Sequence, residues 1–256
     1  MTHIAMLSGG QDSSCMAVKI LEEGLPLDYI LFCDTGKEFK VMYEYIDKLD
    51  AYIKIRFGMS ITRIGKPEKF DEFCFGEFTK GEREGQTRGL PLTLGMQYCT
   101  RELKVVPVEK WAKENIKGEY VTYIGYTYSE LKRADVKDER QRFPLIDYKM
   151  KESDVTEFLQ ERNIWNPLYK HFTRTGCFLC PKQKKEAFFK VWKHFSEEWQ
   201  EMKEYESKCK DMNAYNQTFN IDKTLIELEK EFEYIDKQGS LFDFEYDPML
   251  SCFCGV

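Results

Sequence analysis

The 256-residue chain has no apolar run approaching the ~18–20 residues that cross a bilayer, so we expect no membrane segment. The first apolar run, residues 3–7, is too short for a secretory signal and has no cleavage pattern. The net charge is −6, without the basic excess that is typical of nucleic-acid-binding proteins. Internal repeats and low-complexity segments are also missing. We therefore expect a soluble cytoplasmic protein.

Cysteine, in contrast, is abundant, with nine residues in the chain. Structural disulfides are rare in the cytosol, so these residues are better read as core thiols, metal ligands or reactive sulfurs. Hydrophobic residues make up 42% of the chain and aromatic residues 15%, which is enough for a real core. The length predicts one large domain, or one domain with an appendage.

A glycine turn at residues 8–14 (S-G-G-Q-D-S-S) organises the chain. It follows the apolar run 3–7 and precedes an amphipathic run, 15–21, which predicts strand, turn and helix. Gly9 and Gly10 can adopt backbone angles that point successive N–H groups into one concavity. The helix behind the turn adds its positive dipole end. The turn therefore predicts a phosphate site.

The spacing of this turn differs from G-x-x-x-x-G-K-[ST] and from G-x-G-x-x-G. It resembles the S-G-G-x-D-S signature of the PP-loop ATP pyrophosphatases, which cleave ATP between the α and β phosphates. The resemblance implies that Asp12 holds Mg²⁺ or orients a serine. It also implies that the rest of the turn holds the nucleotide, through Ser8, Gly9, Gly10, Gln11, Ser13 and Ser14.

Strand-like and helix-like runs alternate through the first part of the chain. Residues 28–32, 60–64 and 121–125 read as strands, and residues 39–53 and 105–113 as helices. This predicts an α/β fold with a doubly wound, mostly parallel sheet, similar to the adenine nucleotide alpha-hydrolases. We expect a nucleotide-binding domain over 1–150 and a mainly helical region with a Cys-x-x-Cys knuckle over 151–256.

Two long segments complete this outline. Residues 70–95 are rich in glycine and read as a lid or substrate-facing loop. Residues 184–208 and 221–235 have helical apolar spacing.

Further segments resemble the phosphoadenosine phosphosulfate (PAPS) reductase-like branch of this superfamily. They are D-T-G-K-E at residues 34–38, C-T-R-E-L-K-V-V-P at 99–107, G-Y-T-Y-S-E-L-K-R at 125–133 and P-L-I-D at 144–147. The resemblance extends from residue 8 to about residue 180 and includes the ATP-dependent subunit of DNA phosphorothioation systems. It implies that Asp34, Thr35, Gly36, Gly125 and Glu130 contact the nucleotide.

Three cations are candidates for catalysis. Arg101 and Lys104 lie about one helical turn apart, and Arg133 ends the segment 125–133. Such groups neutralise charge that grows on a leaving pyrophosphate. The resemblance therefore implies a catalytic set of Asp12, Arg101, Lys104 and Arg133.

Cys177 and Cys180 form a C-x-x-C knuckle that we expect to run into a helix, with Pro181 in its first turn. Two thiolates at this spacing suit zinc, an iron–sulfur cluster or a redox dithiol. Thiolating relatives hold a [4Fe–4S] cluster through a cysteine in the segment of Cys99, which implies a third ligand there. Zinc held by the knuckle with Cys252 and Cys254 fits the spacing equally well. Other candidate ligands are Cys74, Cys209, His171 and His194.

The combined hypothesis is an ATP pyrophosphatase that adenylates an acceptor and supports sulfur transfer. A nucleic acid is one acceptor class, and a sulfur-donor protein is an expected partner. A basic stretch that could contact a nucleic-acid backbone comprises Lys182, Lys184, Lys185, Lys190 and Lys193. The oligomeric state is left open, with a homodimer as one option.

Two alternatives are kept. One is a PAPS reductase or sulfotransferase. The sequence S-C-F-C-G-V at residues 251–256 argues against it, because the reductases carry E-C-G-x-H at this end. The other is a nucleotide-binding module without catalysis, against which the intact turn argues.

Overall fold

A computed structural model of the chain describes residues 1–91, 98–134, 138–219 and 223–237. Packing divides it into two units. The first unit comprises Met1–Asp34, Lys40–Gly65 and Val106–Lys170. The second comprises Thr35–Phe39, Lys66–Val105 and the described residues of His171–Val256. The domain boundary near residue 150 stays a prediction, and the two units are described separately below.

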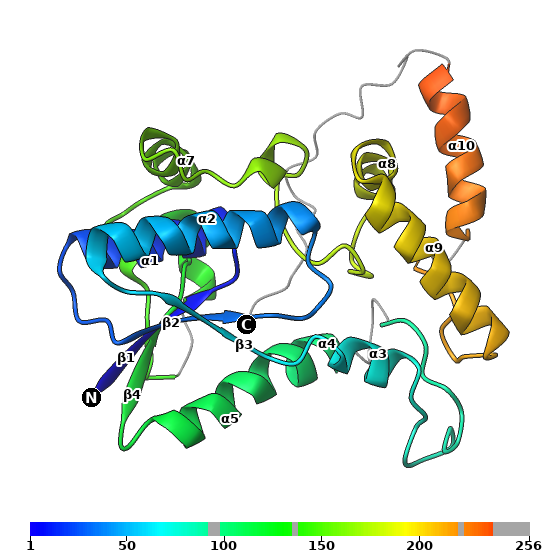
Figure 1. Cartoon of the computed structure of the whole chain (residues 1–256), viewed down its shortest axis with the longest axis horizontal. Helices are drawn as coiled ribbons and strands as arrows, with labels where there is room; N and C mark the ends of the chain where they lie inside the picture. Colours follow the sequence, from blue (N-terminus) through cyan, green and yellow to red (C-terminus); the bar gives the residue numbers. More distant parts are fainter. Residues whose placement is uncertain (92–97, 135–137, 220–222, 238–256) are drawn as a thin grey trace. The chain divides into compact units, whose positions relative to one another are not determined.

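A parallel sheet forms the centre of the first unit (Figure 1), and its strand order among the described residues is β3-β2-β1-β4-β5. Its strands are β1 (Thr2–Leu7), β2 (Tyr29–Cys33), β3 (Ile61–Ile64), β4 (Tyr120–Tyr123) and β5 (Gln141–Arg142). The chain moves outward from β1 in one direction through β2 and β3, and in the other through β4 and β5. Such a reversal of strand order is where ligands bind in open α/β sheets.

Helices cover both faces of this sheet, with α1 and α2 on one face and α5 on the other (Figure 1). The helices of the first unit are α1 (Gln11–Glu22), α2 (Lys40–Phe57), α5 (Val106–Asn115), α6 (Pro144–Asp147) and α7 (Glu152–Glu161). Two 3-10 helices join them, η2 (Tyr128–Arg133) and η3 (Pro167–Lys170). The expected α/β fold with a parallel sheet is confirmed.

The alternation of side chains along the strands explains these two layers. Ile4, Leu31 and Ile64 point to one face and form a buried cluster, against which Val108 and Trp111 of α5 pack. The residues that alternate with that face are also buried, namely Ala5, Leu7, Ile30 and Phe32. A sheet that is apolar on both faces requires a helical layer on each.

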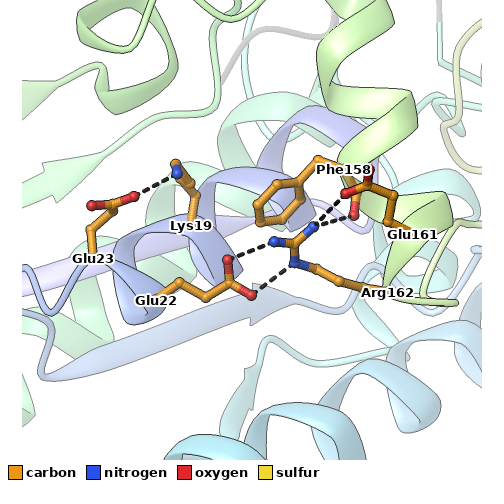
Figure 2. Close-up of polar contacts among 6 residues, drawn as sticks. All are labelled: Lys19, Glu22, Glu23, Phe158, Glu161 and Arg162. Atoms are coloured by element: carbon orange, nitrogen blue, oxygen red, sulfur yellow. Dashed lines mark hydrogen bonds and ion pairs between the residues drawn. The ribbon is translucent and has the colours of Figure 1, made fainter.

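A bidentate ion pair connects α7 to α1 (Figure 2). Arg162, just after α7, donates from Nε and Nη2 to the two carboxylate oxygens of Glu22, at 2.8 and 2.9 Å. Its guanidinium lies 3.5 Å from the centre of the Phe158 ring. The bond to Glu22 raises the pKa of Arg162 above its usual value. Both side chains are about one-fifth exposed, so solvent screens this pair only in part.

The second unit is mainly helical, as expected for the C-terminal region. Its elements are α3 (Lys69–Cys74), α4 (Tyr98–Thr100), the π-helix η1 (Arg101–Val105), α8 (Lys185–His194), α9 (Ser196–Asp211) and α10 (Leu225–Lys237). The single helix expected over 184–208 is wrong. Phe195, at φ −136° and ψ 66°, separates α8 from α9. Its ring packs against Phe39 and Phe172, which fixes the break.

The segment 70–95 is less irregular than expected. It begins within α3, and the chain then folds back on itself through backbone hydrogen bonds from Phe78 to Gln86 and from Gly85 to Phe78. Gly89 donates to Cys74, which closes the excursion at its base. Residues 92–95 lie outside the described part of the chain. The interpretation of residues 70–95 as a lid or substrate-facing loop stays a prediction.

No helix in the described ranges is long and apolar enough to cross a membrane.

Replacing Arg162 with lysine is expected to lower the free energy of unfolding by about 1 kcal/mol, because lysine lacks the planar fork that pairs with both oxygens of Glu22. Urea denaturation measures this difference. Arg63→Lys is the matched control, since Arg63 makes one contact with the exposed Asp47 and should lose little. Equal losses in the two variants would contradict the stabilising role of the bidentate pair.

Candidate functional site

The predicted nucleotide contacts lie in segments that follow β1, β2 and β4, at the carboxyl edge of the sheet in the first unit. The β1–α1 loop is the most constrained of them. Gly9 has φ +77°, a left-handed angle that side chains with a Cβ rarely adopt. A Cβ at this position would also lie 2.4 Å from Met42 Sδ. Both the angle and the space therefore require glycine.

Hydroxyl groups close this loop in a ring of hydrogen bonds. The Ser13 hydroxyl donates to Gly10 O at 3.1 Å and accepts from Ser8 N at 3.1 Å. Ser8 Oγ lies 3.0 Å from Ser13 Oγ, and Gly10 N donates to Ser8 Oγ at 3.3 Å. Because the Ser13 proton is directed at Gly10, the Ser8 hydroxyl is the donor between the two serines. Each bond in such a ring strengthens the next.

The remaining residues of the loop enter α1. Gln11 N donates to Tyr169 Oη at 2.9 Å, and Gln11 Oε1 accepts from Thr156 at 3.2 Å. Asp12 lies in the first turn of α1, where the helix dipole favours a carboxylate. Ser14 is fully buried, and burial raises the pKa of Tyr45 above its usual range.

A second close approach lies between the β4 loop and α1. A Cβ on Gly125 would lie 2.7 Å from both the N and the Cα of Ser13. Backbone therefore contacts backbone where the strand order reverses. Gly125 lets the β4 loop approach the first turn of α1, and a larger residue would push the two apart.

Beyond Gly125, η2 carries the predicted cation. Arg133 forms an ion pair with Glu130, and its guanidinium lies 4.4 Å from the centre of the Tyr126 ring. The Tyr126 ring also stacks on Phe143, whose ring is 5.5 Å away and nearly parallel to it. Arg133 is thus held by a charge and by a stacked ring, and about a quarter of its side chain is exposed.

Glu152 ties the same loop to α7. It accepts from Thr127 Oγ1 at 2.9 Å and from Ser129 Oγ at 2.7 Å. Thr127 is fully buried. The loop that carries Arg133 is therefore anchored at its start by the carboxylate of the first residue of α7.

The segment after β2 is divided between the units. Asp34 belongs to the first, where Asp34 N donates to Ile64 O at 2.8 Å and its carboxylate accepts from Tyr43 Oη at 2.7 Å. Thr35 and Gly36 belong to the second unit. Thr35 is buried and donates to Glu38 at 3.1 Å.

Arg101 and Lys104 lie in the second unit, on the π-helix η1. Three-quarters of the Arg101 side chain is exposed. Short π-helical segments inside α-helices occur frequently at functional sites. The sequence pattern places these cations one turn apart but does not indicate the π-helix that carries them.

The knuckle of Cys177 and Cys180 is a turn closed by Cys180 N and Cys177 O at 3.2 Å. The expected continuation into a helix is wrong, because α8 begins only at Lys185 and Pro181 lies in a turn. Cys177 is partly exposed and Cys180 is buried. Cys99 lies in α4 of the same unit and is also partly exposed.

The described part of the chain does not group these cysteines with further ligands. Within the described ranges, no three histidine, cysteine, aspartate or glutamate side chains are grouped to hold an ion. Cys252 and Cys254 lie outside the described residues. Two competing candidates, Cys74 and Cys209, are buried as a pair with their sulfurs 3.8 Å apart. The iron–sulfur and zinc ligand sets stay predictions.

Some lysines of the basic stretch and the two candidate histidines contact other residues of the second unit. In the basic stretch, Lys185 pairs with Glu231 and Lys193 with Asp236. His171 and His194 lie against each other with ring centres 4.2 Å apart and ring planes tilted by 37°.

Sequence reasoning missed two residues that contact the β1–α1 loop. Asn166 directly precedes η3, and Tyr169 lies within it. Asn166 Nδ2 donates to Gly9 O at 2.8 Å. The available signal was Pro167, which restricts Asn166 to extended or turn conformations. That signal indicates a turn but not its partner.

The family model of the phosphoadenosine phosphosulfate reductase domain matches residues 2–183. The chain belongs to this family. The match spans the β1–α1 loop, the β4 loop and the Cys177 knuckle, so the expected resemblance to the PAPS reductase-like branch is confirmed. Membership in the PAPS reductase domain family supports a nucleotide-binding enzyme at this coarse level.

Relatives of this PAPS reductase domain include two proteins of Methanocaldococcus jannaschii, the uncharacterized proteins MJ0066 and MJ0973. They are 24% identical over 217 residues and 28% identical over 198 residues. The alignments cover 78% and 72% of this chain but 41% and 42% of the relatives. The chain therefore spans less than half of their length. A crystal structure of PAPS reductase from Candida auris, a phosphate complex, is similar with a TM-score of 0.45 and 14% identity, covering 69% of this chain and 81% of that one.

Replacing Gly125 with alanine is expected to lower the free energy of unfolding by about 1–3 kcal/mol, since the new methyl group would overlap the Ser13 backbone. Urea denaturation tests this. Gly176→Ala is the control, because a Cβ there meets nothing within 4 Å and no left-handed angle is involved. Equal stability of the two variants would refute the close approach in this PAPS reductase domain.

Cys15 in α1 is expected to resist alkylation. Burial, followed by the charge of Asp12, raises the pKa of its thiol to about 12, so only about one in 10⁴ molecules carries the thiolate at pH 8. Iodoacetamide labelling with peptide mass spectrometry should modify the partly exposed Cys177 and leave Cys15 intact. Both should react in urea. Comparable native labelling of the two would contradict this assignment.

Proposed function

We propose that this chain is an ATP pyrophosphatase. It binds Mg·ATP at the β1–α1 loop, transfers AMP to an acceptor and releases pyrophosphate. The observation that carries the proposal is the loop itself, with Gly9 in a left-handed turn and the hydroxyls of Ser8 and Ser13 in one ring. Behind it, α1 begins after Gly10, which has no side chain to cap the helix. Loops of this kind bind phosphate groups.

In the proposed reaction, a nucleophile of the acceptor attacks the α-phosphorus of ATP. The bond to the oxygen that bridges the α and β phosphates breaks, and pyrophosphate leaves with the electron pair. Negative charge therefore grows on the pyrophosphate. The N–H groups of the loop and the positive end of α1 offset it, together with the guanidinium of Arg133. Because Glu130 and Tyr126 already hold Arg133, little reorganisation is needed.

Magnesium fits this site through Asp12, whose carboxylate is a hard oxygen ligand in the first turn of α1. The ion would neutralise phosphate charge when ATP is bound. The hydrogen-bonded ring of Ser8 and Ser13 holds the loop in the shape that orients the nucleotide.

Sulfur transfer is the proposed second half of the reaction. A sulfur nucleophile attacks the adenylated acceptor and AMP leaves. The partly exposed Cys177 is the proposed carrier in this chain: its thiolate takes the outer sulfur of a persulfide on a sulfur-donor protein, whose own thiolate leaves. When the terminal sulfur of the Cys177 persulfide attacks the acceptor, a disulfide joins the two, and a thiol reductant cleaves it to release the thiolated acceptor. No metal step is included, since the described cysteines do not form a cluster. A nucleic acid is the acceptor class to test first.

Incubation of the protein with Mg·ATP labelled at the α-phosphate tests the first half directly. AMP or an adenylated acceptor, with pyrophosphate, is the expected product pair. Labelled ADP would overturn the proposal, since it means cleavage between the β and γ phosphates. Reduction of PAPS to sulfite by a thiol reductant, without turnover of ATP, would instead favour the reductase that the family name describes.

Replacing Arg133 with glutamine is expected to lower kcat for pyrophosphate release about 100-fold with a smaller change in KM, because the lost charge acts on the transition state. Arg140→Gln is the matched control, as Arg140 is exposed and forms an ion pair with Asp138. A loss confined to KM would indicate that Arg133 only binds the ground state.

A further inference from the structure

Asn166 is a buried amide that bridges the β1–α1 loop and the start of η3. It is fully buried. Its Nδ2 donates to Gly9 O at 2.8 Å, and its Oδ1 accepts from Leu168 N at 2.9 Å. The second bond is local and fixes the side chain relative to η3. The first spans 157 residues and fixes the loop relative to that side chain.

The bond to Gly9 O determines where the next N–H points. In a planar trans peptide, the C=O of one residue and the N–H of the next are directed oppositely. Because Asn166 holds Gly9 O, Gly10 N–H is directed away from Asn166, toward Ser8 Oγ at 3.3 Å. The hydrogen bond from Gly10 N to Ser8 Oγ is long and exposed, so a phosphate oxygen can replace Ser8 Oγ as the acceptor.

Tyr169 holds the following peptide by its N–H rather than by its carbonyl. Its hydroxyl accepts from Gln11 N at 2.9 Å, which directs the carbonyl of Gly10 to the opposite side. There Gly10 O accepts from the Ser13 hydroxyl and from Ser14 N. Asn166 and Tyr169 therefore orient two consecutive peptide groups of the loop.

We propose that Asn166 and Tyr169 are positioning residues, which hold the peptides between Gly9 and Gln11 in the orientation that binds the pyrophosphate part of the nucleotide. Asn166 holds the Gly9 carbonyl on its own side and leaves Gly10 N–H to the ligand, as an anion cradle requires, while Tyr169 fixes the following peptide by accepting from Gln11 N–H. This inference rests on the proposed function for the identity of the ligand. Neither residue belongs to the glycine turn, and neither is assigned contact with the reacting atoms.

The test uses Asn166→Asp, which has nearly the same shape. The variant keeps an oxygen that accepts from Leu168 N but faces Gly9 O with an acceptor in place of the amide donor. Isothermal titration with inorganic pyrophosphate and Mg²⁺ should show at least a tenfold rise in Kd. Hydrogen exchange of the loop peptide, measured without ligand, should become faster.

Asn216→Asp is the matched control. Asn216 Nδ2 also donates to a backbone carbonyl, Leu90 O at 3.0 Å, but in the second unit. A purely structural loss would lower the melting temperature in both variants and leave the Kd of the folded protein unchanged. Tyr169→Phe, which removes only the hydroxyl, is the second variant if Asn166→Asp does not fold. A several-fold rise in Kd is expected for it.

The outcomes separate the two proposals. Wild-type Kd and loop exchange in both Asn166→Asp and Tyr169→Phe would overturn the positioning role. Failure of the wild-type protein to bind pyrophosphate would overturn it as well. If the wild-type protein binds pyrophosphate but does not turn over ATP, the proposed function fails, and the effect of the two variants on pyrophosphate binding still decides the positioning role.

Discussion

The arrangement of the first unit depends on close backbone packing around the turn between β1 and α1. Gly9 leaves no room for a Cβ beside Met42 of α2, and Gly125 leaves none beside Ser13 of α1. The turn is therefore enclosed by a neighbouring helix and by the loop of a neighbouring strand. Such enclosure fixes where the first turn of α1 points, because interiors packed this closely do not deform gradually. The direction of the helix dipole follows from it.

Of the three candidate catalytic cations, one belongs to the first unit and two belong to the second. Arg133 belongs to the same unit as the glycine turn, and its guanidinium is held by Glu130 and Tyr126. Arg101 and Lys104 belong to the other unit, and their assignment to catalysis rests on the resemblance of their segment to the family. For this reason Arg133 is the cation on which the proposed mechanism relies. A preorganised cation stabilises developing charge more than one that must first be ordered.

The strand, turn and helix over residues 3–21 can be predicted from sequence, because every signal in them is local. Asn166 cannot, since its partner Gly9 is 157 residues away and nothing near Asn166 indicates the contact. The break between α8 and α9 at Phe195 cannot be predicted from the sequence for a similar reason. The apolar spacing continues through it, and the break comes from packing against Phe39 and Phe172. Local pattern thus predicts the loop, whereas tertiary contacts determine what holds it.

The ion pairs of the lysines in α8 affect how well the basic stretch can bind a nucleic-acid acceptor. A polyanion is bound by cations that release its counterions, so each lysine already paired with a carboxylate contributes less. Lys185 and Lys193 pair with Glu231 and Asp236 of α10. The basic stretch is therefore weaker as a nucleic-acid surface than its sequence indicates, and the net charge of −6 adds no general attraction. A nucleic-acid acceptor would have to be recognised through a few specific contacts, and its binding should depend less on salt than that of a basic groove.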